Sequence, residues 1–144
     1  MEFSLSHPVN CLCHNLRSAS RKITLVYDDA MRSVGIRATQ FSLLATIDGV
    51  GGENLATVTK LADQMGMDRT TLTRNLAVAE AQKWVTIRQG SDLRERVITL
   101  TPAGRRKLQE AMPLWKSAQK RVVEKLGKGN IQELLIIARS IRTD

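Results

Sequence analysis

The feature that most constrains this 144-residue chain is the order of patterns in its middle third. Residues 57–65 carry apolar side chains at helical spacing, and Gly66 follows them as a helix stop. Asp68 is placed to cap a second helix over residues 69–82, in which three apolar positions predict a buried face: Leu72, Leu76 and Ala79. Two short helices joined by a glycine-containing turn predict a helix-turn-helix unit.

Two segments of alternating apolar and polar residues, 85–88 and 96–100, follow this unit. The turn formers Gly90, Ser91 and Asp92 lie between them, so the segments predict a β-hairpin with a polar, extended loop. Helix, turn, helix and hairpin in this order are typical of a winged helix-turn-helix. In such modules the second helix enters the major groove of DNA, and the hairpin, or wing, reaches the flanking backbone or the minor groove.

Two helices are predicted before this unit. An apolar stripe at helical spacing runs through residues 12–30, and Gly35 is expected to end that helix. Thr39 is expected to cap a short second helix with four apolar residues: Phe41, Leu43, Leu44 and Ile47. The run Gly49-Val50-Gly51-Gly52 then predicts a flexible connection with too little side chain to pack.

Two more helices are predicted after the hairpin. Thr101 and Pro102 supply an N-cap and a first-turn proline for a long helix, which Pro113 is expected to bend and which ends at Gly127-Lys128-Gly129. The last helix carries apolar residues from Ile131 to Ile141. Together the N- and C-terminal helices present more apolar stripe than one small winged-helix core can cover, so a second copy of the chain is expected against them. A monomer with a helical cap is the alternative.

The sequence thus predicts one mainly α domain, residues 1–144, with a small β-hairpin wing. Its dimerisation helices are expected at about 11–48 and 102–144, on either side of a DNA-binding lobe at 54–101. No apolar run is long enough to span a bilayer, and the N-terminus lacks the layout of a secretory signal, so a cytoplasmic protein without a membrane partner is expected.

All of the net charge of +8 lies in the part of the chain that holds the helix-turn-helix and the wing. Residues 1–53 carry five basic and five acidic side chains, whereas residues 54–144 carry 17 and nine. An excess of this size favours a polyanion as partner, and a merely basic surface is the alternative. Aromatic residues make up only 3% of the chain, too few for the stacking surfaces that bind single strands, so duplex DNA is expected.

Eight polar side chains are candidates for contacts with DNA. Four of them lie near the N-terminal end of the second helix of the unit, on the side away from its apolar face: Arg69, Thr70, Thr73 and Arg74. In and beside the hairpin loop they are Arg88, Asp92, Arg94 and Arg96. Arg94 is placed to enter a narrow minor groove, and Asp92 is expected to orient a neighbouring arginine through a bidentate ion pair. An ordinary solvated helix and an ordinary charged turn are the alternatives.

The chain resembles the MarR family of bacterial transcriptional regulators. The resemblance rests on residues 61–62, on Asp68 to Leu76, and above all on Asp92-Leu93-Arg94 leading into residues 98–104. It implies an obligate homodimer of interleaved terminal helices, a palindromic operator, repression, and release by a small-molecule ligand or an oxidant. The chain departs from the family pattern at two positions: Lys83 replaces the usual glycine after the recognition helix, and Ala79 replaces a leucine.

Cys11 and Cys13 stand at the start of the first helix, beside His7 and His14. Four ligands within eight residues cannot easily surround one tetrahedral metal ion, so no metal site is expected. The plain interpretation is that the two cysteines serve as small, partly buried apolar side chains. A helix N-terminus also favours the thiolate, the reactive form of cysteine, so oxidant sensing is a third interpretation.

Residues 13–21 resemble the peroxide-sensing OhrR branch of the same family. The resemblance implies that Cys13 senses an organic peroxide and that Tyr27 engages it, although Arg17 replaces a second tyrosine of that branch. Cys11 lies outside the pattern and could convert an oxidised Cys13 into a strained short-range disulfide. A response that does not depend on Cys13 would instead indicate a small-molecule pocket between the first helix and the DNA-binding lobe, with Tyr27 lining it.

Two other function classes are the alternatives to a DNA-binding regulator. One is a winged-helix module that docks an acidic protein and does not bind DNA. The other is an enzyme, such as a thiol peroxidase built on Cys13. The sequence disfavours an enzyme because it has no glycine-rich phosphate loop and no paired catalytic carboxylates, and no cofactor is expected.

Overall fold

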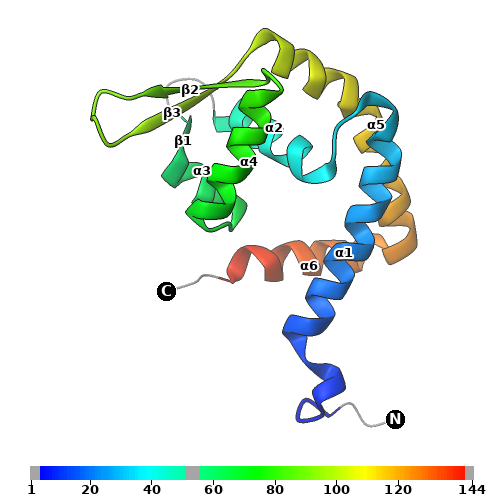
Figure 1. The fold of residues 1–144 in the computed structure, drawn as a ribbon. Coiled ribbons are helices and arrows are strands. Elements are labelled where there is room, and N and C mark those ends of the chain that lie inside the picture. Colours follow the sequence, from blue (N-terminus) through cyan, green and yellow to red (C-terminus); the bar gives the residue numbers. More distant parts are fainter. Residues whose placement is uncertain (1–3, 51–55, 142–144) are drawn as a thin grey trace.

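The computed structural model describes residues 4–50 and 56–141, which form a helix-rich structure with one small antiparallel sheet (Figure 1). In chain order the elements are η1 (Pro8–Asn10), α1 (Leu12–Met31), η2 (Arg32–Val34), α2 (Ala38–Val50), β1 (Ala56–Thr57), α3 (Val58–Met65), α4 (Arg69–Ala81), β2 (Val85–Gln89), β3 (Arg96–Leu100), α5 (Pro102–Leu126) and α6 (Lys128–Ser140). The predicted helix-turn-helix and wing are confirmed as α3, α4 and the β2–β3 hairpin.

The sheet contains a strand that the sequence patterns did not predict. β1 pairs antiparallel with β3, Ala56 opposite Ile98, and the strand order is β1-β3-β2. Two residues are too short to show alternation, so this strand is defined by its partner and not by a local signal. Thr57 ends β1 and also caps α3, because its hydroxyl oxygen accepts a hydrogen bond from the Lys60 backbone N–H. The start of α3 is thereby fixed against the wing.

α2 supplies much of the hydrophobic core. Four of its side chains are buried: Phe41, Leu43, Leu44 and Ile47. They pack with buried residues of the helix-turn-helix and the sheet, among them Leu61, Leu72 and Ile98. Phe41 also stacks on Trp115 of α5, with ring centroids 5.5 Å apart. A core shared in this way joins the DNA-binding lobe to the long C-terminal helix.

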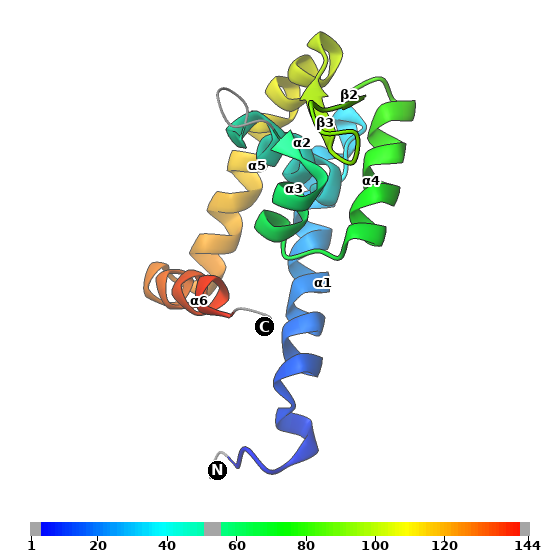
Figure 2. The ribbon, with the colours of Figure 1, turned by 90° about the vertical axis from the view of Figure 1, so that its left-hand side faces the viewer.

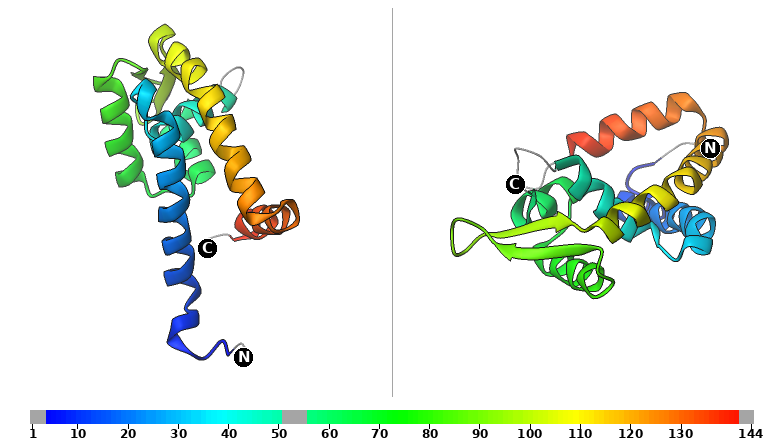
Figure 3. Two further views of the ribbon diagram at one scale, coloured as in Figure 1. Left: turned by 90° about the vertical axis from the view of Figure 1, so that its right-hand side faces the viewer. Right: turned by 90° about the horizontal axis from the view of Figure 1, so that it is seen from above.

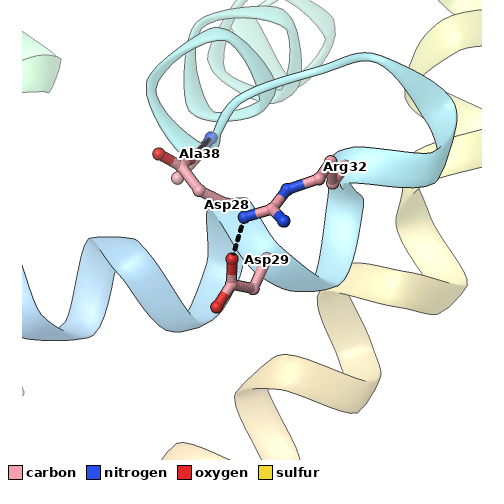
Figure 4. Close-up of polar contacts among 4 residues, drawn as sticks. All are labelled: Asp28, Asp29, Arg32 and Ala38. Carbon is pink, nitrogen blue, oxygen red and sulfur yellow. Dashed lines mark hydrogen bonds and ion pairs between the residues drawn. The ribbon is translucent and has the colours of Figure 1, made fainter.

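The predicted cap of α2 was wrong. Thr39 lies inside the helix, and the first N–H groups are satisfied by other side chains: Asp28 of α1 accepts from the Ala38 backbone at 2.7 Å, and Gln40 accepts from the Arg37 backbone at 2.9 Å. Figure 4 shows this corner, where Asp29 also pairs with Arg32 on the exposed side. The cap comes from the preceding helix, ten residues away along the chain, so a local pattern could not reveal it.

The first half of the predicted glycine-rich connection is helical. Gly49 and Val50 belong to the last turn of α2, and Val50 is half-buried against the core. Gly51 and Gly52 lie outside the described residues.

α4 ends in a conformation that suits glycine. Lys83 has φ = 61°, in the left-handed region, and its backbone N–H donates to the Glu80 carbonyl at 2.8 Å. The next N–H, of Trp84, donates to the Ala79 carbonyl at 3.0 Å. These are the two hydrogen bonds of a glycine-type helix end, here made with a lysine whose Cβ crowds the backbone. The departure at Lys83 therefore changes the strain of the helix end and not its geometry.

We expect Lys83→Gly to stabilise the protein. Glycine adopts the observed φ without the Cβ clash, and the relief should exceed the entropy it adds to the unfolded chain, for a net gain of about 1 kcal/mol. Urea unfolding of the two proteins would measure it. Because the Lys83 side chain is exposed, Lys83→Ala is the matched control: it keeps the Cβ and should give no gain. Equal stabilisation by alanine would show that backbone strain is not the cause.

The junction of wing and α5 is closely packed. Thr101 caps α5 by accepting from the Gly104 backbone N–H at 3.0 Å, and its hydroxyl donates to the Lys83 carbonyl at 2.6 Å. Its own N–H donates to the Trp84 carbonyl at 3.0 Å. A Cβ on Gly104 would lie 2.0 Å from the carbonyl oxygen of Trp84, so only glycine fits there. The ends of α4 and of the wing are held together at this point.

The terminal helices extend away from the lobe. Figures 2 and 3 show α1 and α5 side by side, with the N-terminal part of α1 projecting beyond the other elements. α6 turns back from the end of α5 and crosses below the lobe (Figure 1). α5 runs as one helix through Pro113. α1 ends at Met31, and the unpredicted η2 follows it as far as Gly35, the residue predicted to end the first helix.

Candidate nucleic-acid interface

The N-terminus of α4 is fixed by Asp68, as predicted. Its carboxylate accepts hydrogen bonds from the Thr71 hydroxyl at 2.6 Å and from the Thr71 backbone N–H at 2.8 Å. These hydrogen bonds, the hydroxyl first, lower the pKa of the Asp68 carboxyl below its usual value. The carboxylate therefore stays ionised and capped, and the first turn of α4 is held in the helical conformation.

α4 turns its predicted DNA-contacting side chains to solvent. Leu72, Leu76 and Ala79 are buried, whereas the four candidates are exposed: Arg69, Thr70, Thr73 and Arg74. No acidic residue occurs from residue 69 to residue 79. Figures 2 and 3 show α4 at the outer edge of the lobe, where a duplex could approach it. The Thr73 hydroxyl donates to the Arg69 carbonyl at 2.7 Å, so the side chain offers an acceptor oxygen and a methyl group to a partner.

The wing is a projecting hairpin with a structured tip (Figure 3). Asp92 accepts a hydrogen bond from the Arg94 backbone N–H at 3.0 Å, and Gln89 donates to the Leu93 carbonyl at 3.0 Å. The expected ion pair between Asp92 and an arginine is absent from the described residues. Asp92 instead forms a local turn with the backbone, an arrangement that short acidic side chains favour. Its role is to shape the tip that presents the exposed Arg94 side chain.

Arg69, Arg94 and Arg96 come together in one cleft. Its volume is about 460 Å³, and it lies between the start of α3, the start of α4 and the wing. The remaining lining residues are Thr57, Val58, Thr59, Asp92 and Glu95. The three arginines outnumber the two carboxylates of the lining, so the cleft has an excess of positive charge that favours an anion such as a backbone phosphate. Thr57 and Thr59 were missed in the sequence, although a threonine N-cap before residues 58–65 was a usable signal.

Arg88 is not part of this cleft. It lies on β2 opposite Val97, and its side chain lines a separate hollow with Glu80 and Lys83. Of the five arginines predicted to contact DNA, the structure thus brings three together in the cleft. Arg88 and Arg74 do not line it. Arg88 is exposed and remains a candidate for an independent phosphate contact.

The two cysteines are exposed free thiols at the start of α1, not partly buried side chains as the plain interpretation required. Cys11 is the residue before the helix, with φ = −57° and ψ = 115°. The Asn15 amide donates to the carbonyls of Val9 and Cys11, each at 2.9 Å, and so holds the preceding segment against the first turn. Among the described residues no group of three His, Cys, Asp or Glu side chains is placed to hold a metal ion.

Tyr27 is not near Cys13 within one chain. The two residues are 14 positions apart on the same straight helix, which corresponds to about 21 Å along its axis. The Tyr27 hydroxyl instead donates to the Gln119 side-chain oxygen of α5, and burial raises the pKa of the phenol. An encounter between Cys13 and Tyr27 would therefore need the tyrosine of a second chain.

Tyr27 also lines a cavity of about 530 Å³ between α1, α2, α5 and α6. Its walls carry apolar and hydroxyl side chains and no charged group, for example Ile23, Thr24, Met67 and Trp115. The cavity corresponds in position to the predicted small-molecule pocket between the first helix and the DNA-binding lobe.

Exposed apolar side chains gather on the terminal helices. On α1 and the segment before it they are Leu5, Val9, Leu12, Leu16 and Leu25. On α6 and just after it they are Leu134, Leu135, Ile136, Ile137 and Ile141. Many of them are more than half exposed, which is costly for so many neighbouring side chains in a monomer. No helix in the described ranges is both long and apolar enough to cross a bilayer.

Comparisons with known proteins agree with this geometry. A model of the MarR family matches residues 34–95. The transcriptional regulator MosR of M. tuberculosis, solved in complex with DNA, is 38% identical; the match covers 92% of this chain and 99% of that one, with a TM-score of 0.77. An uncharacterized HTH-type transcriptional regulator of Bacillus subtilis, YwoH, is 26% identical over 99 residues, 69% of this chain and 70% of the relative. A mutant of MarR from E. coli, solved with operator DNA, shares the fold at a TM-score of 0.80 and 18% identity, covering 98% of this chain and 100% of that one.

Proposed function

The chain belongs to the MarR family of DNA-binding transcriptional regulators, and we propose that it acts as a homodimeric repressor of a palindromic operator. The observation that carries the proposal is the exposed face of α4, which has no acidic residue from 69 to 79, beside a cleft whose three arginines outnumber its two carboxylates. We place α4 in the major groove, where Arg74 and Thr70 meet base edges, and the wing arginine Arg94 on the adjacent backbone or minor groove. Family members are regulators and not enzymes.

The exposed apolar side chains of α1 and α6 support the homodimer. A twofold partner would bury both sets and would carry a second α4 on the same side of the assembly. Two recognition helices related in this way fit two half-sites of a palindrome. The DNA-bound structure of MosR supports a duplex as the partner.

A gel shift of the pure protein on duplex DNA from its own promoter region, at moderate salt, tests this function. Binding at or below micromolar protein is expected, and it should weaken steeply as salt rises, because arginines replace condensed counterions. Absence of a shift at micromolar protein would favour the alternative, a winged-helix module that docks an acidic protein.

We further propose that oxidation of the N-terminal cysteines releases the operator. In this scheme the Cys13 sulfur attacks an organic hydroperoxide, which breaks the O–O bond and yields a sulfenic acid and an alcohol. The Cys11 thiol then attacks the sulfenic sulfur, giving a disulfide and one water molecule. Cys11 precedes α1 and Cys13 lies in its first turn, and helical backbone at Cys13 does not suit a disulfide to a residue only two positions away. Closing the disulfide is therefore expected to open this turn and to break the Asn15 contacts.

Cumene hydroperoxide is expected to abolish the gel shift of the wild type and to leave that of Cys13→Ser unchanged. Cys11→Ser should stop at the sulfenic acid, which mass spectrometry separates from the disulfide by its retained oxygen. The cavity lined by Tyr27 supports a second candidate, an uncharged small-molecule effector that fits about 530 Å³. An equal response of the wild type and Cys13→Ser would contradict the cysteine mechanism and leave the cavity as the effector site.

A further inference from the structure

The exposed face of α4 changes character along its length. Residues spaced by four lie one above the other on a helix, so this face consists of two rows. One row is Thr70, Arg74 and Val78, and the other is Thr73, Ala77 and Ala81; all six are exposed. The N-terminal half of the face carries hydroxyl groups and a guanidinium, whereas the C-terminal half carries only methyl groups.

Val78 is the unusual member of this face. Its side chain is 49% exposed, and it follows Arg74 by one turn in the same row. Valine is a poorer helix former than alanine, and an isopropyl group that is about half exposed gains little from burial in the folded chain. Single exposed apolar residues are common, but Val78 adjoins two alanines on a surface that otherwise holds the proposed base contacts. Helix propensity accounts for Ala77 and Ala81, but neither helix propensity nor core packing explains Val78.

The rest of α4 fixes the direction in which Val78 points. Arg69 faces the wing cleft, and Glu80 lines the hollow beside β2. At about 100° per residue, Val78 lies roughly 180° around the helix from Arg69, on the flank away from the wing. The small side chains of Ala77 and Ala81 lie between these flanks, so base edges could approach the backbone of α4 closely in its second half.

We propose that Val78, with Ala77 and Ala81, recognises thymine methyl groups in the major groove. The 5-methyl group of thymine is the one apolar group that a base pair presents there, and small apolar side chains are its usual partners. Each operator half-site should therefore hold A·T pairs beside the position contacted by Arg74. This inference rests on the proposed function, since it assumes that α4 enters the major groove.

The test begins with a randomised 30-base-pair duplex library, from which the wild-type protein selects a consensus. That duplex is then synthesised with thymine or with uracil at each conserved thymine, a change that removes only the methyl group. We expect the wild type to prefer the thymine duplex by roughly fourfold for each methyl group contacted. Val78→Ala should bind the uracil duplex about as well as the wild type does, and its preference for thymine should be smaller at the methyl group that Val78 contacts, because the shorter side chain no longer reaches it.

Arg74→Ala is the matched control on the same row. It should weaken binding to both duplexes and keep the ratio between them, because it leaves Val78 in place. Val78→Ala removes an exposed side chain from a helix and introduces a better helix former, so its folding should be intact, which circular dichroism checks. A wild type indifferent to uracil, or a Val78→Ala variant that keeps the full preference, would overturn the inference. If the wild type selects no duplex at all, the proposed function fails first.

Discussion

Gly104→Ala is expected to lower the free energy of unfolding by about 3 kcal/mol. The new methyl group would lie 2.0 Å from the carbonyl oxygen of Trp84, a contact that only a backbone shift can relieve. That carbonyl also accepts the Thr101 N–H, so a shift would disturb the junction of α4, the wing and α5. Urea unfolding followed by circular dichroism measures the change.

Gly49→Ala is the control for this substitution. Gly49 also lies in a helix, but nothing stands within 4 Å of a Cβ built there. Alanine is the better helix former, so the protein should keep its stability or gain up to about 1 kcal/mol. Equal losses at both positions would contradict the packing argument, since only Gly104 is in contact with a neighbouring backbone.

Arg74→Ala is expected to weaken binding to the selected duplex by about 1–3 kcal/mol and to relax the preference at one base pair of each half-site. The reason is that a guanidinium exposed on the outward face of α4 can make a bidentate contact with guanine. A repeated selection with the variant would show which position loses its preference.

Arg94→Ala should behave differently, because the wing tip is expected to contact backbone or minor groove. Affinity should fall for specific and nonspecific duplexes alike, and the slope of log K against log salt should flatten by roughly two units for a dimer with two wings. Binding titrations at several salt concentrations measure the slope. An unchanged affinity in both arginine variants would remove the assignment of α4 and the wing to DNA.

Most of the fold could be predicted from short sequence patterns that act between neighbouring residues. Asp68, Gly66 and the Thr101-Pro102 pair each act within four residues along the chain, and the helix ends that they predicted are present. The exposed positions of α4 followed from its buried face, because helical spacing decides both.

Contacts between distant segments were not predictable in the same way. β1 depends on pairing with β3, about 40 residues later, and the cap of α2 is a side chain of α1. The cleft of Arg69, Arg94 and Arg96 requires the wing to fold back beside α3, which no spacing in the sequence specifies. The two thiols could be named from the sequence, but their exposure could not, since it depends on how far α1 projects from the lobe.

The most direct test of the account is methylation interference at guanine N7, which lies in the major groove, on the selected duplex. Two recognition helices of a homodimer should give two symmetric sets of interfering guanines, centred about one helical turn or a whole number of turns apart. A single set, or none while the protein remains bound, would contradict the placement of a pair of α4 helices in the major groove.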